Sequence, residues 1–263
     1  MKEDFSKYNG EGTVLRKAQM RMLEILIEVD KICRKHNITY WLDFGTLLGA
    51  VRHGGFIPWD DDLDISVPRK DYLRLCKILK KELPDNLIFQ DETTDKFYPL
   101  KFAKVRDRCS YLEDIGISQK VKEKGIYIDI FPIERGTLKL KNAIDFFYGR
   151  SFRRLRHHSG GKLEYIISLT MYPFASCLVF LARMFNFLIS DNLLIYGYGV
   201  PTVNKYQLHK KDLIPVKQVF FENHIFSSPS NPDAYLRELY GNYMQIPPEE
   251  KRATHATKIE IYD

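Results

Sequence analysis

A chain of 263 residues is long enough for one elaborated domain, or for one domain with a helical appendage, to bury a full core. Its 44% hydrophobic and 13% aromatic content excludes general disorder. The formal net charge of +6 suits anionic substrates or an anionic membrane surface, and it is too small to indicate nucleic-acid binding by itself.

The four cysteines are spaced as isolated thiols. Cys33, Cys76, Cys109 and Cys177 form no Cys-x-x-Cys pair, which favours free thiols in a reducing compartment over two disulfides. Residues 1–12 are polar, mixed in charge and free of a signal-peptide pattern, so we expect a cytoplasmic site of action.

In the first half of the chain, apolar periodicity predicts helices that alternate with strands. Apolar residues recur at helical spacing between Thr13 and His36, and Gly45-Thr46 separates a strand from a short helix that ends at Gly54-Gly55. We expect helices at residues 13–36, 47–52 and 69–82, and strands at residues 38–42, 63–67, 87–90, 100–106 and 126–131.

From Leu138 onward the pattern is more helical and more basic. We expect, in chain order, a helix from 138 to 147, a basic stretch at 150–162, an apolar run at 165–182, a hairpin within 213–226 and a helix at 233–240. No internal repeat or low-complexity linker divides the chain.

The apolar run at 165–182 has three interpretations. It carries no charge and is barely long enough to span a membrane, but Pro173 interrupts it and hydroxyl side chains dilute it. A buried pair of core helices is the second interpretation. The third is an interfacial element, because the basic stretch at 150–162 lies immediately upstream and would favour anionic lipid headgroups.

An acidic cluster marks the candidate site. The segment from Pro58 to Val67 places Asp60, Asp61, Asp62 and Asp64 close together and runs into a strand-like stretch. In an extended strand, Asp62 and Asp64 point to the same face. Two such carboxylates repel each other by about 1 kcal/mol in water, and by more when half-buried. Bound Mg²⁺ or Mn²⁺ would remove that penalty, and oxygen ligands without His or Cys favour these ions over zinc.

Two further features complete a phosphoryl-transfer arrangement. The small residues Gly45 and Thr46 would let backbone N–H groups and a hydroxyl approach a phosphate at a helix N-terminus. Asp129 lies in an otherwise apolar strand, where an isolated carboxylate would be costly to bury, so it is the candidate for a third metal-binding carboxylate. The alternative is structural: a charged turn at Asp60–Asp64, and a loop cap at Asp129 before Pro132.

The sequence resembles the LicD family, which includes bacterial phosphocholine transferases and is related to fukutin-type enzymes. The segments that carry the resemblance are Tyr40–Arg52, Gly55–Asp64, Lys101–Arg106, Ile126–Pro132, Tyr240–Met244, Pro247-Pro248 and His255. The stretch 138–212 is unmatched. The resemblance implies an α+β fold of the polymerase-β-like nucleotidyltransferase superfamily, in which a mixed sheet is flanked by helices.

That resemblance also implies a division of the chain. Residues 1–137 would form the catalytic core, residues 138–212 a basic and apolar helical insertion, and residues 213–263 a C-terminal segment that returns to the core. A membrane-facing position of the insertion is one of the three interpretations given above. The expected location is the cytoplasm, with association at the inner face of the membrane under that interpretation.

The activity implied by the resemblance is transfer of phosphocholine from CDP-choline to a sugar hydroxyl, with release of CMP. The acceptor would be a cell-surface glycan precursor such as a lipid-linked oligosaccharide, teichoic-acid-like or lipopolysaccharide-like. Asp60, Asp62 and Asp64 match the family's metal-binding aspartates, and Gly45-Thr46 matches its small-residue turn. Asp129 would accept the hydroxyl proton or share a second metal ion.

Several other residues are candidates for binding the donor. Arg52, Lys104 and Arg106 carry cations suited to phosphate oxygens. Trp59 would offer an aromatic face to the choline ammonium, and His255 would reach the catalytic site from the C-terminal tail. The alternatives without a functional role are solvated charges for the three cations, an ordinary core position for Trp59 and a structural role for His255.

Two other functions use the same features. A nucleotidyltransferase could use the same metal centre to make a CDP- or UDP-activated compound. A non-catalytic module could bind nucleotide or glycan, although the paired carboxylates would then be kept without use. Nucleic acid is not an expected partner, since no basic stripe interleaved with aromatic residues stands out beyond 150–162.

Overall fold

A computed structural model describes residues 4–114, 119–157, 161–201, 207–252, 254 and 256–262. The helices are α1 (Ser6–Asn9), α2 (Val14–Lys35), α3 (Phe44–His53), α4 (Arg69–Glu82), α5 (Leu138–His157), α6 (Lys162–Met184), α7 (Lys210–Leu213) and α8 (Pro232–Tyr240), with short 3₁₀ turns η1 (Asn186–Leu188) and η2 (Glu249–Lys251). The strands are β1 (Trp41–Leu42), β2 (Asp64–Pro68), β3 (Leu87–Gln90), β4 (Ala103–Asp107), β5 (Ser110–Asp114), β6 (Tyr127–Arg135), β7 (Leu193–Tyr196), β8 (Leu208–His209), β9 (Lys217–Phe221), β10 (His224–Ser228) and β11 (Ala256–Ile261).

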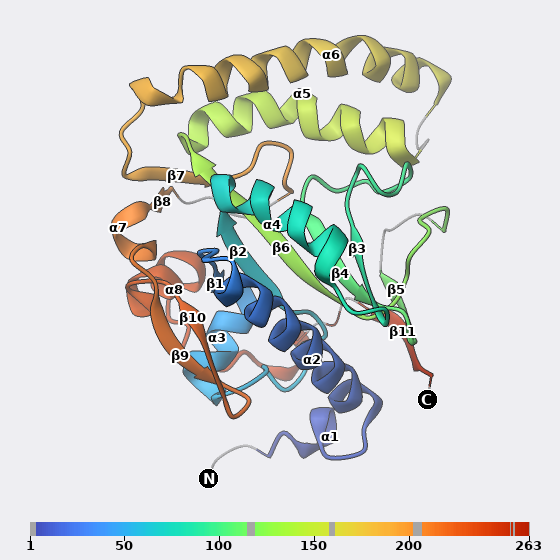
Figure 1. Cartoon of the computed structure of the whole chain (residues 1–263), viewed down its shortest axis with the longest axis vertical. Helices are drawn as coiled ribbons and strands as arrows, with labels where there is room; N and C mark the ends of the chain where they lie inside the picture. Colours follow the sequence, from blue (N-terminus) through green and yellow to red (C-terminus); the bar gives the residue numbers. More distant parts are fainter. Residues whose placement is uncertain are drawn as a thin grey trace.

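A mixed sheet forms the centre of the molecule. Its strands run in the order β1-β2-β6-β4-β3, and β7 pairs with both β6 and β8. The β2–β6 pair is parallel and the other pairs are antiparallel. Helices α2 and α4 pack on the sheet, in front of it in Figure 1. The expected α+β, nucleotidyltransferase-like architecture is confirmed.

Helix α2 follows the predicted apolar stripe. Thr13 is its N-cap, and the Thr13 hydroxyl accepts a hydrogen bond from the backbone N–H of Arg16 at 3.2 Å. Ala18, Met22, Ile25 and further residues of the same stripe are buried against the sheet. The predicted helix at 13–36 is therefore confirmed to within one residue at each end.

Helix α3 begins earlier than predicted. Asp43 caps it, because its carboxylate accepts a hydrogen bond from the backbone N–H of Phe44 at 2.7 Å. Gly45 and Thr46 therefore lie in the first turn of the helix, not in a break before it. The helix ends as predicted at Gly54, whose φ of 72° lies in the left-handed region.

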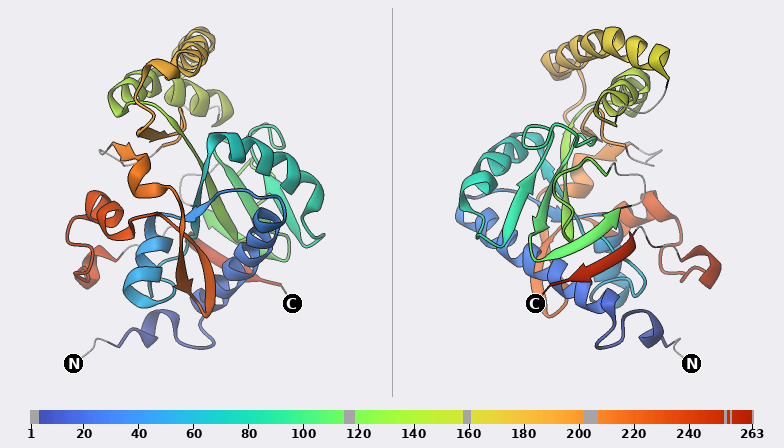
Figure 2. Two further views of the ribbon diagram at one scale, coloured as in Figure 1. Left: turned by 60° about the vertical axis from the view of Figure 1, so that its left-hand side comes forward. Right: turned by 90° about the vertical axis from the view of Figure 1, so that its right-hand side faces the viewer.

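Helices α5 and α6 form an outer layer on the molecule. Both views in Figure 2 show α6 as the layer farthest from the sheet, with α5 beneath it. The basic stretch from 150 to 157 continues α5, and α6 runs through Pro173 without ending. A small apolar cluster joins this layer to the sheet, made by Ile144, Tyr148, Ala175, Val179, Ile195 and Tyr198.

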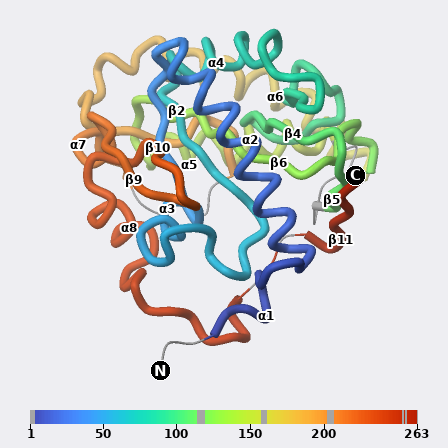
Figure 3. The backbone as a smooth tube through the Cα atoms, turned by 60° about the horizontal axis from the view of Figure 1, so that its bottom comes forward, coloured from blue at the N-terminus to red at the C-terminus, as the bar shows by residue number. Residues whose placement is uncertain are grey.

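Strands β5, β7, β8 and β11 have no counterpart in the sequence prediction. Figure 3 shows β11 beside β5 near the C-terminus, where the two strands pair antiparallel. Strands β7 and β8 lie within the predicted insertion at 138–212, yet they join the central sheet. The predicted boundaries at 137 and 212 stay predictions, while the outer layer itself is confined to α5 and α6.

Candidate active site

The sheet brings charged residues from three strands into one row. Asp64 of β2 lies directly opposite Asp129 of β6, and Lys104 of β4 lies opposite Asp129 on its other side. Directly opposed residues project from the same face of a sheet. The Lys104 ammonium lies 2.7 Å from the Asp129 carboxylate, and both side chains are largely buried.

The loop before β2 adds two carboxylates to this row. Burial, followed by the charge of Asp62, raises the pKa of Asp60 well above its usual range. Burial also raises the pKa of Asp64, with added contributions from the charges of Asp62 and Asp129. Asp60, Asp62, Asp64 and Asp129 therefore act on one another as one negative cluster, called here the acidic cluster.

Gly45 makes room for one member of the acidic cluster. A Cβ atom added at Gly45 would lie 2.5 Å from a carboxylate oxygen of Asp60. That separation is too short for any real contact, so a side chain at position 45 would push Asp60 out of place. Glycine at position 45 thus leaves room for the Asp60 carboxylate. A contact between Gly45 and a phosphate stays a prediction.

Thr46 acts on strand β2. Its side chain is buried, and its hydroxyl accepts a hydrogen bond from the backbone N–H of Asp64 at 2.8 Å. This bond fixes the start of β2 and therefore the position of the Asp64 side chain. The predicted contact between the Thr46 hydroxyl and a phosphate also stays a prediction.

Arg52 is next to the acidic cluster on α3. Burial lowers the pKa of its guanidinium, and the charge of Asp60 acts in the opposite direction. The guanidinium donates to the backbone carbonyl of Tyr243 at 2.8 Å, so it also joins α3 to the segment after α8. Its neighbour His53 has a pKa lowered to about 4, by burial and by the Arg52 charge.

The Arg106 guanidinium is buried and donates hydrogen bonds within the core. Its side chain is 1% exposed and donates to Gln90 at 2.6 Å and to the carbonyl of Gly125 at 2.7 Å. The guanidinium also lies over the ring of Tyr127. Arg106 shares a face with Lys104, but β3 and the turn at Gly125 cover it. These contacts give Arg106 a structural role, and its expected phosphate contact stays a prediction.

Trp59 lies in an aromatic cluster with residues of the N-terminal segment. Its ring contacts Phe5 and Tyr8, and the Arg252 guanidinium lies 4.7 Å from its centroid. The side chain is buried, with a cation already over the ring, so a choline contact at Trp59 stays a prediction. The predicted role of His255 falls outside the described residues.

Two residues near the acidic cluster were not selected from the sequence. Asp43 is fully buried and accepts hydrogen bonds from Ser66, Tyr196 and Tyr235, and burial raises its pKa despite these donors. Tyr240 ends α8, and its pKa is raised by burial and then by the charge of Asp64. The sequence offered Tyr240 only as part of the Tyr240–Met244 segment and as one of several aromatic residues near the motifs.

The ligand atoms that the acidic cluster offers suit a hard divalent cation. It offers only carboxylate oxygens, and their mutual repulsion would be relieved by Mg²⁺ or Mn²⁺. As the side chains stand, no group of three or more Asp, Glu, His or Cys residues in the described part of the chain is arranged to hold a metal ion. A cation would therefore have to draw the carboxylates together.

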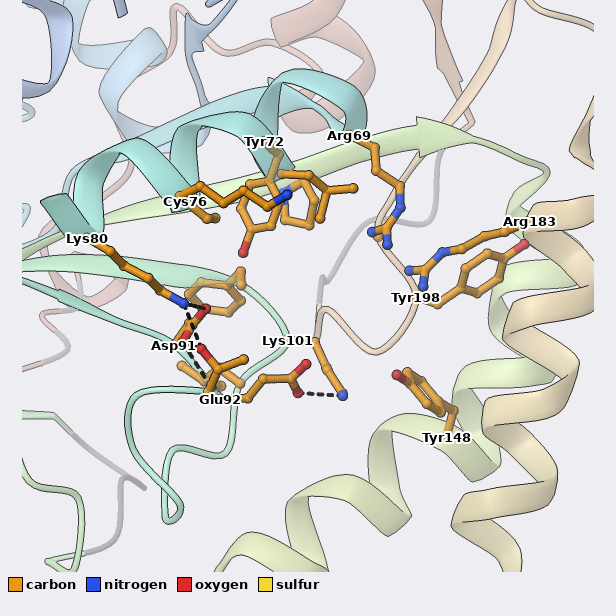
Figure 4. Close-up of a pocket in the computed structure, with 17 residues that line it drawn as sticks. Arg69, Tyr72, Cys76, Lys80, Asp91, Glu92, Lys101, Tyr148, Arg183 and Tyr198 are labelled. Atoms are coloured by element: carbon orange, nitrogen blue, oxygen red, sulfur yellow. Dashed lines mark hydrogen bonds and ion pairs between the residues drawn. The ribbon is translucent and has the colours of Figure 1, made fainter. Parts of the chain in front are cut away.

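A separate cavity of about 270 Å³ lies between α4 and the α5–α6 layer (Figure 4). Arg69, Lys80, Lys101, Tyr148 and Arg183 are among the residues that line it. Carboxylates neutralise much of its positive charge: Lys101 pairs with Glu92 at 2.5 Å, and Arg183 pairs with Glu134 at 2.8 Å. The described lining includes no member of the acidic cluster, so this cavity is not the candidate active site.

Comparison with known proteins places the acidic cluster in a recognised domain. Residues 37–181 match the family described as LicD/FKTN/FKRP, nucleotidyltransferase domain. The chain is 28% identical over 262 residues to the lipopolysaccharide cholinephosphotransferase LicD of Haemophilus influenzae, covering 92% of this chain and 95% of that protein.

Two shorter similarities accompany that match. An uncharacterized protein of Rickettsia prowazekii is 32% identical over 162 residues, which cover 62% of this chain and 53% of that protein. The human ribitol 5-phosphate transferase FKRP is 53% identical over 34 residues, or 13% of this chain and 7% of that protein. The acidic cluster lies wholly within the matched domain at 37–181.

Proposed function

The chain belongs to the LicD/FKTN/FKRP family of nucleotidyltransferase domains, and from this premise we propose that it transfers phosphocholine to a glycan. The observation that carries the proposal is the acidic cluster, in which Asp64 and Asp129 face each other across β2 and β6 with Asp60 and Asp62 beside them. The full-length similarity to a lipopolysaccharide cholinephosphotransferase supports phosphocholine as the transferred group.

The proposed donor is CDP-choline and the proposed acceptor is a sugar hydroxyl of a cell-surface glycan precursor. The hydroxyl oxygen attacks the phosphorus that carries choline, the bond from that phosphorus to the CMP oxygen breaks, and CMP leaves. Two relatives named for transfer of choline phosphate and of ribitol 5-phosphate support a reaction of this class. The acceptor would belong to a lipopolysaccharide-like or teichoic-acid-like polymer.

The chain's own residues would mainly orient the reactants and manage charge. Asp129, which pairs with Lys104 at 2.7 Å, would accept the proton of the attacking hydroxyl. Arg52 lies beside the acidic cluster and would bind donor phosphate oxygens. Thr46 fixes the start of β2 and so keeps Asp64 in register with Asp129.

We propose Mg²⁺ or Mn²⁺ as the resident cofactor. Asp62 and Asp64 would hold it, with Asp60 and Asp129 as further oxygen ligands. When bound, such an ion neutralises the charge that develops on the diphosphate of a nucleotide donor. The crowding of these carboxylates supports this assignment, because the ion would remove their repulsion.

The decisive experiment supplies the purified full chain with Mg²⁺, CDP-choline and a lipid-linked oligosaccharide. We expect CMP to be released and the acceptor to gain the mass of one phosphocholine. In a parallel reaction CTP replaces CDP-choline, with choline phosphate as co-substrate. Pyrophosphate from the CTP reaction, without acceptor modification, would establish a nucleotidyltransferase instead. Binding of CDP-choline without turnover would indicate a non-catalytic module.

A further inference from the structure

Helix α6 exposes an apolar face along its whole length. Within the described residues, Lys162–Met184 is the helix that is long and apolar enough to cross a membrane, by length and composition alone. Only 17% of its most apolar 18-residue segment is buried in the molecule. The exposed large apolar side chains of α6 are Leu163, Ile166, Ile167, Leu169, Phe174, Phe180, Leu181 and Met184. Phe185, Phe187 and Leu188 extend this surface beyond the helix end.

The opposite side of α6 explains how the helix is held. Ser168, Ala175 and Val179 are buried, at spacings that place them on one side of a helix. Ala175 and Val179 pack with Ile144 and Tyr148 of α5. The helix is thus fixed by a narrow stripe, and the wide remaining surface is apolar and exposed. A soluble protein rarely keeps so large an apolar patch without a partner.

The two ends of α6 exclude a simple transmembrane span. The helix is about 35 Å long, enough to cross a bilayer. However, it packs antiparallel on α5. Arg183 in its last turn pairs with Glu134 of β6, and β7, which follows in the chain, joins the central sheet. A span would separate the helix ends by a membrane thickness and would break its packing on α5. An orientation parallel to the membrane surface keeps both.

Exposed cations of the α5–α6 layer favour an anionic lipid surface over a second copy of the chain. Arg150 and Arg153 are exposed on α5, next to exposed Phe146 and Phe147. Lys162 is exposed at the start of α6. Two copies that met through this face would bring these cations toward one another, whereas phosphate-bearing headgroups would pair with them.

We propose that the α5–α6 layer is an in-plane membrane-binding element. The exposed face of α6, together with Phe146 and Phe147, enters the boundary between headgroups and acyl chains, and Arg150 and Arg153 pair with anionic lipid phosphates. The proposal does not rest on the chemistry of the acidic cluster. It predicts that the catalytic core is held against the lipid surface by α5 and α6 alone.

Cys177 offers a direct probe of insertion. It is exposed on α6 between Phe174 and Phe180, and Cys109 is an exposed thiol in the turn between β4 and β5. The experiment attaches an environment-sensitive fluorophore to Cys177 in a Cys109→Ser chain, and to Cys109 in a Cys177→Ser chain. Vesicles of phosphatidylcholine with 30% phosphatidylglycerol, about a third anionic lipid, should shift the emission to the blue only for the label at Cys177. No shift at Cys177, or equal shifts at both positions, would overturn the proposal.

Flotation with the same vesicles tests which side chains are responsible. Phe174 and Phe180 are 59% and 64% exposed, so Phe174→Asp with Phe180→Asp should fold normally and lower vesicle binding about tenfold or more. Phe220→Asp is the matched control, since Phe220 is 54% exposed on β9, far from α6 in Figure 1. Arg150→Glu with Arg153→Glu should remove the preference for anionic vesicles.

Two other results would assign the exposed face of α6 to a second copy of the chain or to a transmembrane span. If the aspartate pair dissociates a dimer and the wild-type chain binds no vesicles, the face is an interface between copies and the proposal fails. If alkaline carbonate does not release the wild-type chain from vesicles, α6 spans the membrane and the in-plane proposal fails. Activity on a soluble acceptor should be unchanged in the aspartate pair, so membrane binding and catalysis can fail separately.

Discussion

The acidic cluster buries charged side chains, whereas the outer face of α6 exposes apolar side chains to water. In the acidic cluster, carboxylates such as Asp60 and Asp64 are held close together, and burial and mutual repulsion raise their pKa values. On α6, large apolar side chains such as Phe174 and Phe180 face water. Both arrangements lower the stability of the isolated chain. We propose a cation for the first region and a lipid surface for the second.

The two regions differ in how rigidly the chain holds them. Asp64 and Asp129 lie on neighbouring strands in the middle of the sheet, and Thr46 and Lys104 fix their positions. Helix α6 is attached mainly through its packing on α5. Reaction chemistry requires fixed positions, whereas contact with a fluid lipid surface requires only a sufficient apolar area.

The largest effect should come from Asp64→Asn. We expect kcat to fall by about 10³-fold or more, about 4 kcal/mol of transition-state stabilisation. The melting temperature should not fall, because the variant removes a charge that burial and its neighbours disfavour. Asp191→Asn is the control, since Asp191 is exposed and pairs only with Lys210 among the described ion pairs. Activity within tenfold of wild type would contradict a catalytic role for Asp64.

A smaller loss of activity should follow Gly45→Ala. The new methyl group would meet a carboxylate oxygen of Asp60 at 2.5 Å, so Asp60 would have to move. We expect kcat/KM to fall about 10- to 100-fold, which corresponds to about 1.4–2.7 kcal/mol. Steady-state assays with CDP-choline would measure this loss.

Gly161→Ala, immediately before α6, is the control for Gly45→Ala. A Cβ atom at Gly161, just before α6, would meet nothing within 4 Å. Its kcat/KM should stay within a factor of two of wild type, about 0.4 kcal/mol. Equal losses in the two alanine variants would show that position 45 has no special relation to Asp60.

The next effect is a pH dependence at the edge of the acidic cluster. The Arg52 guanidinium donates to Nε2 of His53, and the folded-state pKa of His53 is lowered from 6.5 to about 4. Between these values the unfolded chain binds a proton that the folded chain does not, so stability falls as the pH drops from 6.5 toward 4. The side chain is only half-buried, so we expect a loss of about 1–2 kcal/mol.

Urea unfolding at pH 7.5 and at pH 4.5 would measure this dependence. His53→Gln removes the titrating group, so the difference between wild type and variant should change across this interval by about 1–2 kcal/mol. A parallel pH dependence in both chains would show that His53 contributes nothing to it.

The smallest effect should come from the outer face of α6. Phe174→Ser should change the free energy of unfolding by no more than about 0.5 kcal/mol, since the side chain packs against little in the isolated chain. Val179→Ala is the matched change on the buried side of the same helix and should cost about 1–3 kcal/mol. Chemical denaturation without lipid would compare them, and equal losses would mean that Phe174 is packed.

Local patterns in the sequence predicted most of the fold. The apolar stripe predicted α2, and Pro68 correctly marked the boundary between β2 and α4. The pairs β7–β8 and β5–β11 were missed because their strands are short or polar and form only through partners distant in the sequence. Capping by Asp43 also moved the start of α3 to Phe44, which the glycine at 45 had obscured.

The candidate site was predictable where it depends on strand alternation. Asp64 was selected from the run of aspartates at 60–64 and Asp129 as a carboxylate in an otherwise apolar strand, and the sheet places them opposite each other. The partners of Arg106, Gln90 and Gly125, belong to other parts of the fold, so its burial could not be predicted from the local pattern. Tyr240 reaches the acidic cluster only through the placement of α8, which no local pattern encodes.

Titration calorimetry with Mn²⁺ tests most directly whether these crowded aspartates form a cation site. The wild-type chain should bind Mn²⁺ with a saturable heat signal, and Asp62→Ala and Asp64→Ala should each abolish it while the chains stay folded by circular dichroism. Absence of binding by the wild-type chain at millimolar Mn²⁺, or unchanged binding in both variants, would contradict this account.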